Sequence, residues 1–86
     1  MDKMIKILVL TNQQILISEI EEVGSADIGE PDCKLINPFL IGDDNILKPF
    51  LLTVTKDDIF MIGSDKILTI CDPMPTLLEK YQDLLK

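Results

Sequence analysis

The sequence predicts a small, mainly β protein, with about five curved antiparallel strands in residues 4–72 and an α-helix at residues 76–85. Several short runs alternate apolar with polar side chains, and clusters of Gly, Pro, Asn and Asp separate them. Only the C-terminal residues change to a helical period. Because a flat sheet of five short strands leaves two exposed edges, we expect the strands to close into a small barrel or to form a bent sheet. The 86 residues suffice for a single domain, residues 1–86.

The first two runs have the pattern of a hairpin. Residues 4–11 are rich in aliphatic and β-branched side chains, and Lys6 lies on the face opposite to the alternating apolar residues. Those apolar residues are Ile5, Ile7 and Val9. Asn12-Gln13 predicts a tight turn, because Asn tolerates the positive φ that such turns require. Residues 14–23 then form the second strand, and its expected inner face consists of Leu16, Ser18 and Ile20.

The middle of the chain alternates extended runs with turns. Residues 24–32 are acidic and contain Gly24, Gly29 and Pro31, so we expect an exposed loop. Residues 33–41 are predicted to form a strand, although Pro38 cannot donate to a ladder and therefore indicates a bulge or an edge. The remaining predicted elements are a turn at 42–45, extended runs at 50–55 and 59–62, a short hairpin turn at 63–66 and a strand at 67–71.

The C-terminal residues predict an amphipathic helix. Thr76 and Glu79 have the spacing of a capping box, and Pro75 before them suits a helix start. One apolar stripe follows at helical spacing, made of Leu77, Leu78, Tyr81, Leu84 and Leu85. We expect this stripe to pack on the sheet of its own chain or of a neighbouring subunit rather than to dock a separate partner.

Charge and missing residue types exclude several function classes. The net charge is −7, and the chain contains no Arg, His or Trp. Arg is the side chain that grips phosphates and base edges in a bidentate way, so duplex DNA is not expected as a partner. The longest apolar runs are far shorter than the roughly 20 residues that cross a bilayer, so no membrane role is expected. Without His, the commonest general base and metal ligand is missing, which indicates a non-catalytic protein without a cofactor.

Cysteine usage and the acidic pairs point to a cytoplasmic protein without a metal site. Cys33 and Cys71 lack the short spacing of a zinc site, and Lys6 comes too early for a signal peptide, so we expect reduced thiols in the cytosol. Three acidic pairs lack the spacing of a calcium loop and are interpreted as solvated surface. These pairs are Glu21-Glu22, Asp43-Asp44 and Asp57-Asp58.

Residues 59–70 resemble the second motif of the Sm-like (LSm) family. In that motif a Gly-containing turn joins two apolar strands, and here Gly63 lies between the runs 59–62 and 67–70. Residues 10–18 are similar to the first hairpin of the family, and residues 33–41, which include Asn37, take the place of its third strand. The resemblance covers residues 4–72. In its divergence and its acidic composition, the chain is similar to members of the family that are encoded by bacteriophages.

The resemblance implies a five-stranded bent antiparallel barrel that assembles into a homo-oligomeric ring of five to seven subunits. Such rings form when the fourth strand of one subunit pairs with the fifth strand of the next. The corresponding residues here are Ile59, Phe60, Met61 and Ile62 on one strand and Ile67, Leu68, Thr69 and Ile70 on the other. The resemblance also implies an RNA-chaperone-like role, with single-stranded RNA bound at the pore by Asn37, Gly63, Ser64 and Lys66.

Departures from the family pattern leave a second hypothesis open. Ile62 stands where the family carries Arg or Lys before its Gly, and Leu35 stands where it carries a stacking side chain. The helix follows the strands here and precedes them in the family. The alternative to RNA binding is therefore a ring that serves as a scaffold or protein-interaction module. Asn37 either binds a base edge or satisfies a turn or bulge before Pro38. Residues 63–66 either line the pore or form a plain hairpin turn.

Overall fold

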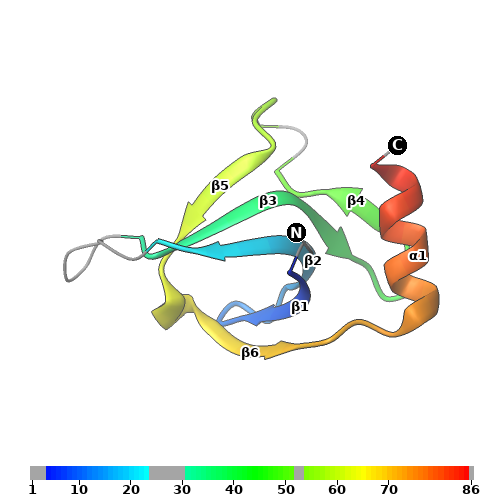
Figure 1. Ribbon diagram of the computed structural model, residues 1–86, viewed down its shortest axis with the longest axis horizontal. Coiled ribbons are helices and arrows are strands. Elements are labelled where there is room, and N and C mark those ends of the chain that lie inside the picture. Colours follow the sequence, from blue (N-terminus) through cyan, green and yellow to red (C-terminus); the bar gives the residue numbers. More distant parts are fainter. Residues whose placement is uncertain (1–3, 24–30, 52–53, 86) are drawn as a thin grey trace.

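The computed structural model describes residues 4–23, 31–51 and 54–85 (Figure 1). These residues form six strands, one short 3₁₀ helix and one α-helix. In chain order they are β1 (Ile5–Leu10), β2 (Ile15–Glu22), β3 (Cys33–Ile41), β4 (Leu47–Pro49), β5 (Ile59–Ile62), the 3₁₀ helix η1 (Ser64–Lys66), β6 (Ile67–Cys71) and α1 (Pro75–Leu84). A mainly β chain with a C-terminal helix is therefore confirmed.

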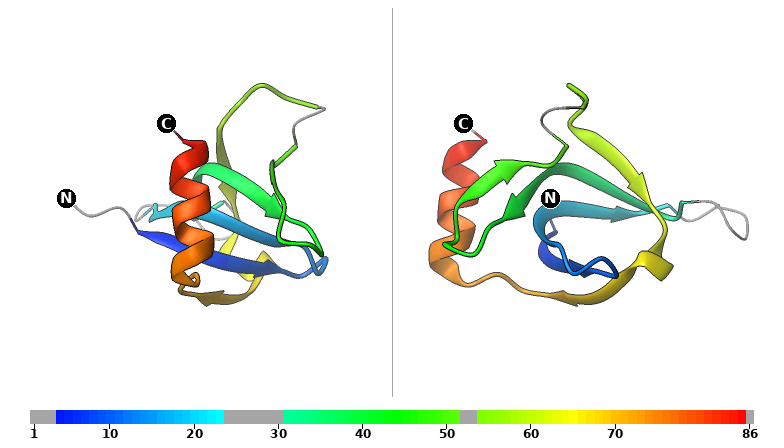
Figure 2. Two further views of the ribbon diagram at one scale, coloured as in Figure 1. Left: turned by 90° about the vertical axis from the view of Figure 1, so that its right-hand side faces the viewer. Right: turned by 180° about the vertical axis from the view of Figure 1, so that it is seen from behind.

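The strands form one antiparallel sheet in the order β4-β3-β2-β1-β6. Strand β5 also pairs with β3: it lies beside the first half of β3, with Cys33 opposite Ile62, while β4 lies beside the second half, with Ile41 opposite Leu47. The sheet curls so that β5 and β6 lie on its two margins, and η1 connects them (Figure 1). α1 and η1 lie at opposite ends of the molecule (Figure 2).

The sheet differs from the predicted five-stranded barrel in its closure and in its strand count. No ladder joins β5 to β6 within the described residues, so the hydrogen-bonded sheet is open there. The predicted hairpin turn at residues 63–66 is wrong, because η1 joins two strands that do not pair with each other. Its backbone closes through the Lys66 N–H, which donates to the Gly63 carbonyl oxygen at 3.0 Å.

The extended run predicted at residues 50–55 is also wrong for its described part. The strand here is β4, which ends at Pro49, and Phe50, Leu51 and Val54 lie in turns. Leu51 has a φ of 58°, which ends an extended chain, and its carbonyl oxygen accepts from the Val54 and Thr55 N–H groups. Residues 52–53 of that run, and 24–30 of the predicted acidic loop, lie outside the described residues.

The β1–β2 turn forms as predicted. The Gln13 N–H donates to the Leu10 carbonyl oxygen at 2.9 Å, and the Asn12 side chain accepts from the Gln14 N–H at 3.0 Å. The positive φ of 70° falls on Gln13 rather than on Asn12, because the Asn12 side chain is used to brace the turn.

The main core cluster lies on one face of the curled sheet, and Ile17 and Tyr81 are also fully buried, outside this cluster. The buried residues of the cluster are Leu8, Leu10, Leu16, Ile20, Cys33 and Leu35. The predicted inner face of the second strand is confirmed, since Leu16, Ser18 and Ile20 are all buried. On β1 the buried residues are Leu8 and Leu10, which share a face with Lys6, whereas the apolar residues of the other face are only half-buried. Lys6 pairs with Asp72 at the end of β6.

Helix α1 packs against the sheet of its own chain through Tyr81. The Tyr81 side chain is 0% exposed, and its ring meets Phe39 of β3 edge-on with the ring centroids 5.6 Å apart. The predicted capping box is wrong: the N-cap is Met74, no side chain caps the helix, and Pro75 is at the first helical position. Pro suits that position because its fixed φ matches the helix and its missing N–H is not needed there.

Candidate functional site

The longest strand, β3, is interrupted by a bulge at Asn37-Pro38. Ile17 pairs with Phe39 and Glu19 pairs with Ile36, so the two bulge residues oppose the single residue Ser18. Asn37 has a φ of 54°, a conformation that Asn tolerates better than other side chains except Gly. The bulge predicted from Pro38 is therefore confirmed, and Asn37 supplies the backbone geometry that it requires.

Two buried hydroxyl groups satisfy the backbone at this bulge. The Ser18 hydroxyl lies 3.1 Å from the Ile36 carbonyl oxygen and 2.8 Å from that of Glu19. The Tyr81 hydroxyl donates to the Asn37 carbonyl oxygen at 2.8 Å and accepts from the Glu19 N–H at 3.3 Å. Burial raises the pKa of the Tyr81 hydroxyl above its ordinary value of 10.0. Helix α1 is thus tied directly to the strained point of β3.

A groove of about 780 Å³ opens beside the bulge. It exists because β5 leaves β3 just before Asn37-Pro38 and β4 joins β3 just after it, so neither strand covers this part of the β3 edge. The groove is lined by residues 37–39, 49–50, 55–58 and 60 and by residues 84–85 at the end of α1. Its volume is within the range of pockets that hold small ligands or peptide side chains.

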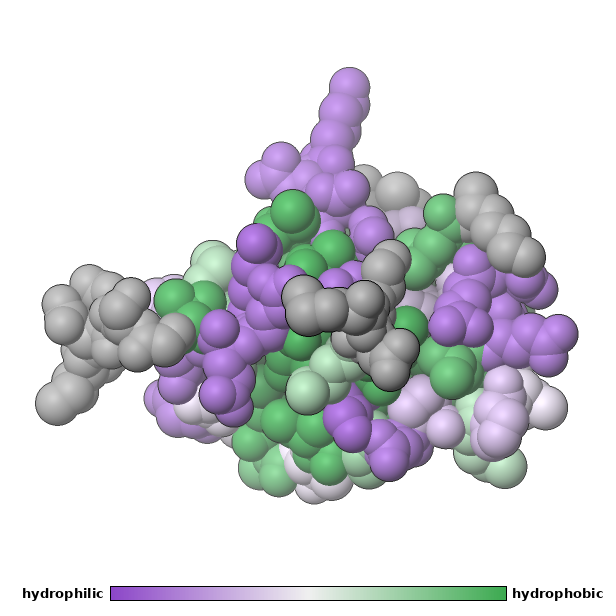
Figure 3. Space-filling model, in the orientation of Figure 1, coloured by the Kyte–Doolittle hydropathy of each residue, from purple (hydrophilic) through white to green (hydrophobic). Residues whose placement is uncertain are grey.

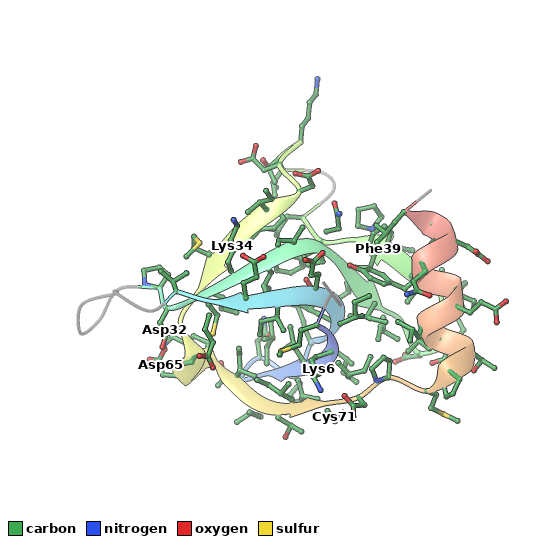
Figure 4. The ribbon with its side chains drawn as sticks, viewed as in Figure 1. Lys6, Asp32, Lys34, Phe39, Asp65 and Cys71 are labelled. Carbon is green, nitrogen blue, oxygen red and sulfur yellow. The ribbon has the colours of Figure 1, made fainter. Side chains whose placement is uncertain are left out.

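The groove combines an aromatic floor with an acidic rim. Phe39, Phe50 and Phe60 are among the lining residues, and the Phe50 and Phe60 rings meet edge-on with centroids 5.7 Å apart, while the Phe39 ring meets Tyr81. Figure 4 shows Phe39 on β3 beside α1. Asp57 and Asp58 are exposed at the rim, and neither forms an ion pair with any residue that the structure describes. Lys56 beside them offsets one of the two negative charges.

The backbone at the groove is already hydrogen-bonded, whereas one amide side chain is not. The Asn37 N–H donates to the Asp58 carbonyl oxygen at 2.6 Å, and the Phe50 N–H donates to that of Pro38 at 3.0 Å. The Asn37 side-chain amide, which is half-buried, has no hydrogen-bond partner in the described part of the chain. The groove therefore offers side-chain groups, rather than a free strand edge, to a ligand.

The turn predicted to bind RNA lies at the other end of the molecule, around η1. The Asp32 carboxylate accepts hydrogen bonds from the Ser64 N–H at 2.6 Å and from the Ser64 hydroxyl at 2.7 Å. These bonds lower the pKa of the Asp32 carboxyl below its ordinary value of 3.8. Lys66 lies 3.7 Å from the Asp65 carboxylate, and Asp32 and Asp65 lie side by side (Figure 4).

The structure does not bring the four predicted RNA-binding residues together. Gly63, Ser64 and Lys66 follow the end of β5 that pairs with Cys33. Asn37 adjoins its other end, where Ile36 pairs with Ile59, about 10 Å away along the strand. Gly63 has a φ of −76°, so its backbone conformation does not require glycine. The predicted set therefore divides into a groove residue and three turn residues.

The residues predicted to form subunit contacts lie on the two marginal strands. On β5, Ile59 and Met61 are 49% and 48% exposed, while Phe60 and Ile62 point to the core. On β6, Leu68 and Ile70 are 64% and 50% exposed, Thr69 is exposed, and Ile67 packs against the core. Apolar residues gather along the lower margin of the molecule, over β6 (Figure 3). Each predicted strand thus presents an apolar outer surface.

Sequence reasoning missed the residues that build the groove. Tyr81 was visible only as part of an apolar stripe, and its hydroxyl contacts depend on where α1 docks. Phe50 and Phe60 are distant in sequence from Phe39, and only the divergence of β4 and β5 brings them together. The one available signal was the dipeptide Asn37-Pro38, which predicted the bulge from which the groove follows.

Neither a metal site nor a membrane-spanning helix is found in the part of the chain that the structure describes. No group of three or more His, Cys, Asp or Glu side chains is placed to hold a metal ion there. None of its helices is long and apolar enough to cross a membrane. Cys33 and Cys71 are both free, Cys33 buried on β3 and Cys71 exposed at the end of β6.

Residues 3–86 match DUF6561, a family of unknown function, and the chain belongs to this family. No curated protein matches the chain.

Proposed function

We propose that this member of the DUF6561 family is a non-catalytic protein that assembles head to tail into a closed ring and acts as a protein-interaction scaffold. In this ring β5 of one copy pairs with β6 of the next. One observation carries the proposal: the two strands each leave one edge unpaired in the described structure and carry exposed apolar side chains beside it.

The two open edges are the feature that assembly would remove. Strand β5 pairs only with β3, and β6 pairs only with β1, among the described strands. An exposed edge with apolar neighbours is a template for pairing with another chain, and closure into a ring abolishes such edges. A chain of 86 residues also buries a smaller fraction of its surface than a larger domain does, so contacts with neighbours add useful burial.

The arrangement of strands supports the Sm-like part of the proposal. The chain passes from β5 through η1 to β6, so the two marginal strands are consecutive but lie on opposite margins of the curled sheet. A head-to-tail contact needs two different edges on each copy, which this arrangement provides. We include in the proposal that the curled sheet is the bent small barrel of the Sm-like family and that the ring has five to seven subunits.

Charge favours a scaffold over an RNA-binding ring. The turn at residues 63–66 holds Lys66, but the Asp65 carboxylate lies 3.7 Å from it and the Asp32 carboxylate is bound to Ser64. A phosphate approaching this turn meets two carboxylates on a chain of net charge −7. RNA binding at this turn is therefore the alternative to the scaffold role.

The non-catalytic role and the location follow from composition. The chain contains no His, and Ser64, whose hydroxyl donates to the Asp32 carboxylate, is exposed at η1. Both cysteines are free, which suits a reducing compartment, and we place the assembly in the cytoplasm.

Size-exclusion chromatography with light scattering tests the assembly. The unmodified chain is expected to elute as one discrete oligomer. The double variant Leu68→Lys/Ile70→Lys, which places two charges on the free β6 edge, is expected to elute as a folded monomer. Val54→Lys/Met74→Lys is the matched control, because it changes two residues that are 72% exposed and lie outside the edges. A monomeric unmodified chain would overturn the ring.

A short oligo-uridine strand added at low salt distinguishes the two roles of the ring. A scaffold is expected to keep its mass and elution volume, whereas an RNA-binding ring gains mass. If RNA binds, Lys66→Ala is the variant that assigns the binding to the turn, because Lys66 is the only cation of that segment.

A further inference from the structure

From the groove beside Asn37-Pro38 we infer that each subunit binds a short, extended, proline-containing peptide that carries Lys or Arg. This inference names the partner class of the proposed scaffold and rests on that role, but it does not depend on the ring, because the groove lies within one chain.

The floor of the groove suits proline and leucine side chains. Three Phe residues, of which Phe50 and Phe60 form a ring pair, and two prolines, Pro38 and Pro49, line it. Aromatic-lined grooves recognise proline-rich segments because such segments are already extended and lose little conformational entropy on binding. A volume of about 780 Å³ accommodates several such side chains.

Backbone bonding in the groove favours this mode over strand addition. The N–H and carbonyl groups of Asn37 and the Pro38 carbonyl already have partners, so a new strand has nothing to pair with there. A polyproline-type segment needs no ladder. Its carbonyl oxygens can instead accept from the half-buried Asn37 side-chain amide, which has no other partner among the described residues.

The rim specifies the charge of the peptide. Asp57 and Asp58 are exposed and unpaired within the described structure, Lys56 on the same rim offsets one of their charges, and the whole chain carries a net charge of −7. Complementary charge steers a cationic partner toward the groove and rejects anionic ones. The same carboxylates repel a phosphate backbone, so a peptide is favoured over single-stranded RNA although both could stack on the rings.

Fluorescence anisotropy with labelled synthetic peptides of about ten residues tests the inference. The first peptide alternates Pro and Leu and ends in two Arg residues. In the second the two Arg residues are replaced by Glu, and in the third Ser replaces every Pro. We expect the first peptide to bind and the other two to bind at least about tenfold more weakly. Equal binding of all three would overturn the inference.

Matched variants locate the binding. Asp57→Asn/Asp58→Asn is expected to weaken binding of the first peptide about fivefold. Asp43→Asn/Asp44→Asn removes the same charge at the exposed β3–β4 turn and is expected to leave binding unchanged. Asn37→Gly removes the amide while tolerating the positive φ, and is expected to weaken binding about fivefold. Equal losses in the groove variant and the turn control would overturn the assignment.

Two further readouts separate this inference from the ring. The monomeric variant Leu68→Lys/Ile70→Lys is expected to bind the first peptide as the unmodified chain does, so failure of the ring leaves the groove testable. The inference would be overturned if no peptide bound, an oligo-uridine strand did bind, and Asn37→Gly weakened that binding. This result would assign the groove to nucleic acid.

Discussion

At the scale of single residues, Asn37 decides the shape of the sheet. With a φ of 54°, Asn37 forms part of the bulge that adds an extra residue to β3, and β4 and β5 separate at this bulge. Bulges are costly unless the freed backbone groups find partners, and here the hydroxyls of Ser18 and Tyr81 serve that purpose. One dipeptide thus produces both the groove and the docking point of the helix.

The Tyr81 hydroxyl is expected to contribute measurably to stability. Tyr81→Phe leaves the Asn37 carbonyl and the Glu19 N–H without this buried partner, so the free energy of unfolding should fall by about 1–3 kcal/mol. Urea denaturation followed by circular dichroism measures the change. Because the variant keeps the ring that meets Phe39, an unchanged free energy would show that the ring contact alone holds α1.

The Asp32–Ser64 contact should weaken as the pH falls below the ordinary pKa of an Asp carboxyl. Hydrogen bonds from Ser64 lower the pKa of the folded Asp32 carboxyl below its ordinary value of 3.8. The stabilisation is therefore fully present above 3.8 and disappears as the pH falls through the lowered value. The Ser64 amide proton, followed by NMR against pH, should titrate with a midpoint below 3.8, and Asp32→Asn should remove the inflection. A midpoint at or above 3.8 would contradict the contact.

At the scale of elements, periodicity predicted most strands and the helix, because their side chains alternate between the core and solvent. The inner face of β2 and the bulge at Pro38 could be read directly from the residues. The start of the helix could not, since Thr76 and Glu79 have the spacing of a capping box although the helix begins at Pro75 with Met74 as its N-cap. Residues 50–55 look extended by composition, but the positive φ of Leu51 breaks the run.

The candidate site was harder to predict than the elements. Asn37 was predicted as an RNA-binding or turn residue, whereas its neighbours in the groove come from β4, from residues 55–58 and from the end of α1. That combination depends on which strands share the edge of β3, and local patterns carry no information about this pairing. The resemblance to the Sm-like family predicted RNA-binding residues within 63–66 instead, and this segment lies at the other end of β5.

The two cysteines report the order of the strands. Cys33 is buried on β3 between β2 and β5, and burial raises the pKa of its thiol, whereas Cys71 is exposed on the marginal strand β6. Ellman's reagent at pH 8 should therefore label Cys71 at least about tenfold faster than Cys33. The variants Cys33→Ser and Cys71→Ser assign the two phases. Equal rates in the folded protein would contradict the placement of β3 inside the sheet.

At the scale of the whole molecule, the curled sheet ends in two unlike edges on an acidic surface. Strands β5 and β6 both expose apolar side chains, and their positions on opposite margins suit head-to-tail contacts. The net charge of −7 opposes unspecific association, so the contacts that we propose between copies have to come from specific strand pairing. The groove lies at the end near α1, away from η1, and is available in each copy.

Mixing two edge variants tests head-to-tail pairing most directly. Ile59→Lys/Met61→Lys blocks the β5 edge and keeps β6, while Leu68→Lys/Ile70→Lys blocks β6 and keeps β5. Each variant alone should be monomeric, and native mass spectrometry of their mixture should show a one-to-one heterodimer, because a single intact pair of edges remains. Homodimers of either variant alone, or a mixture that stays monomeric, would contradict pairing of β5 with β6.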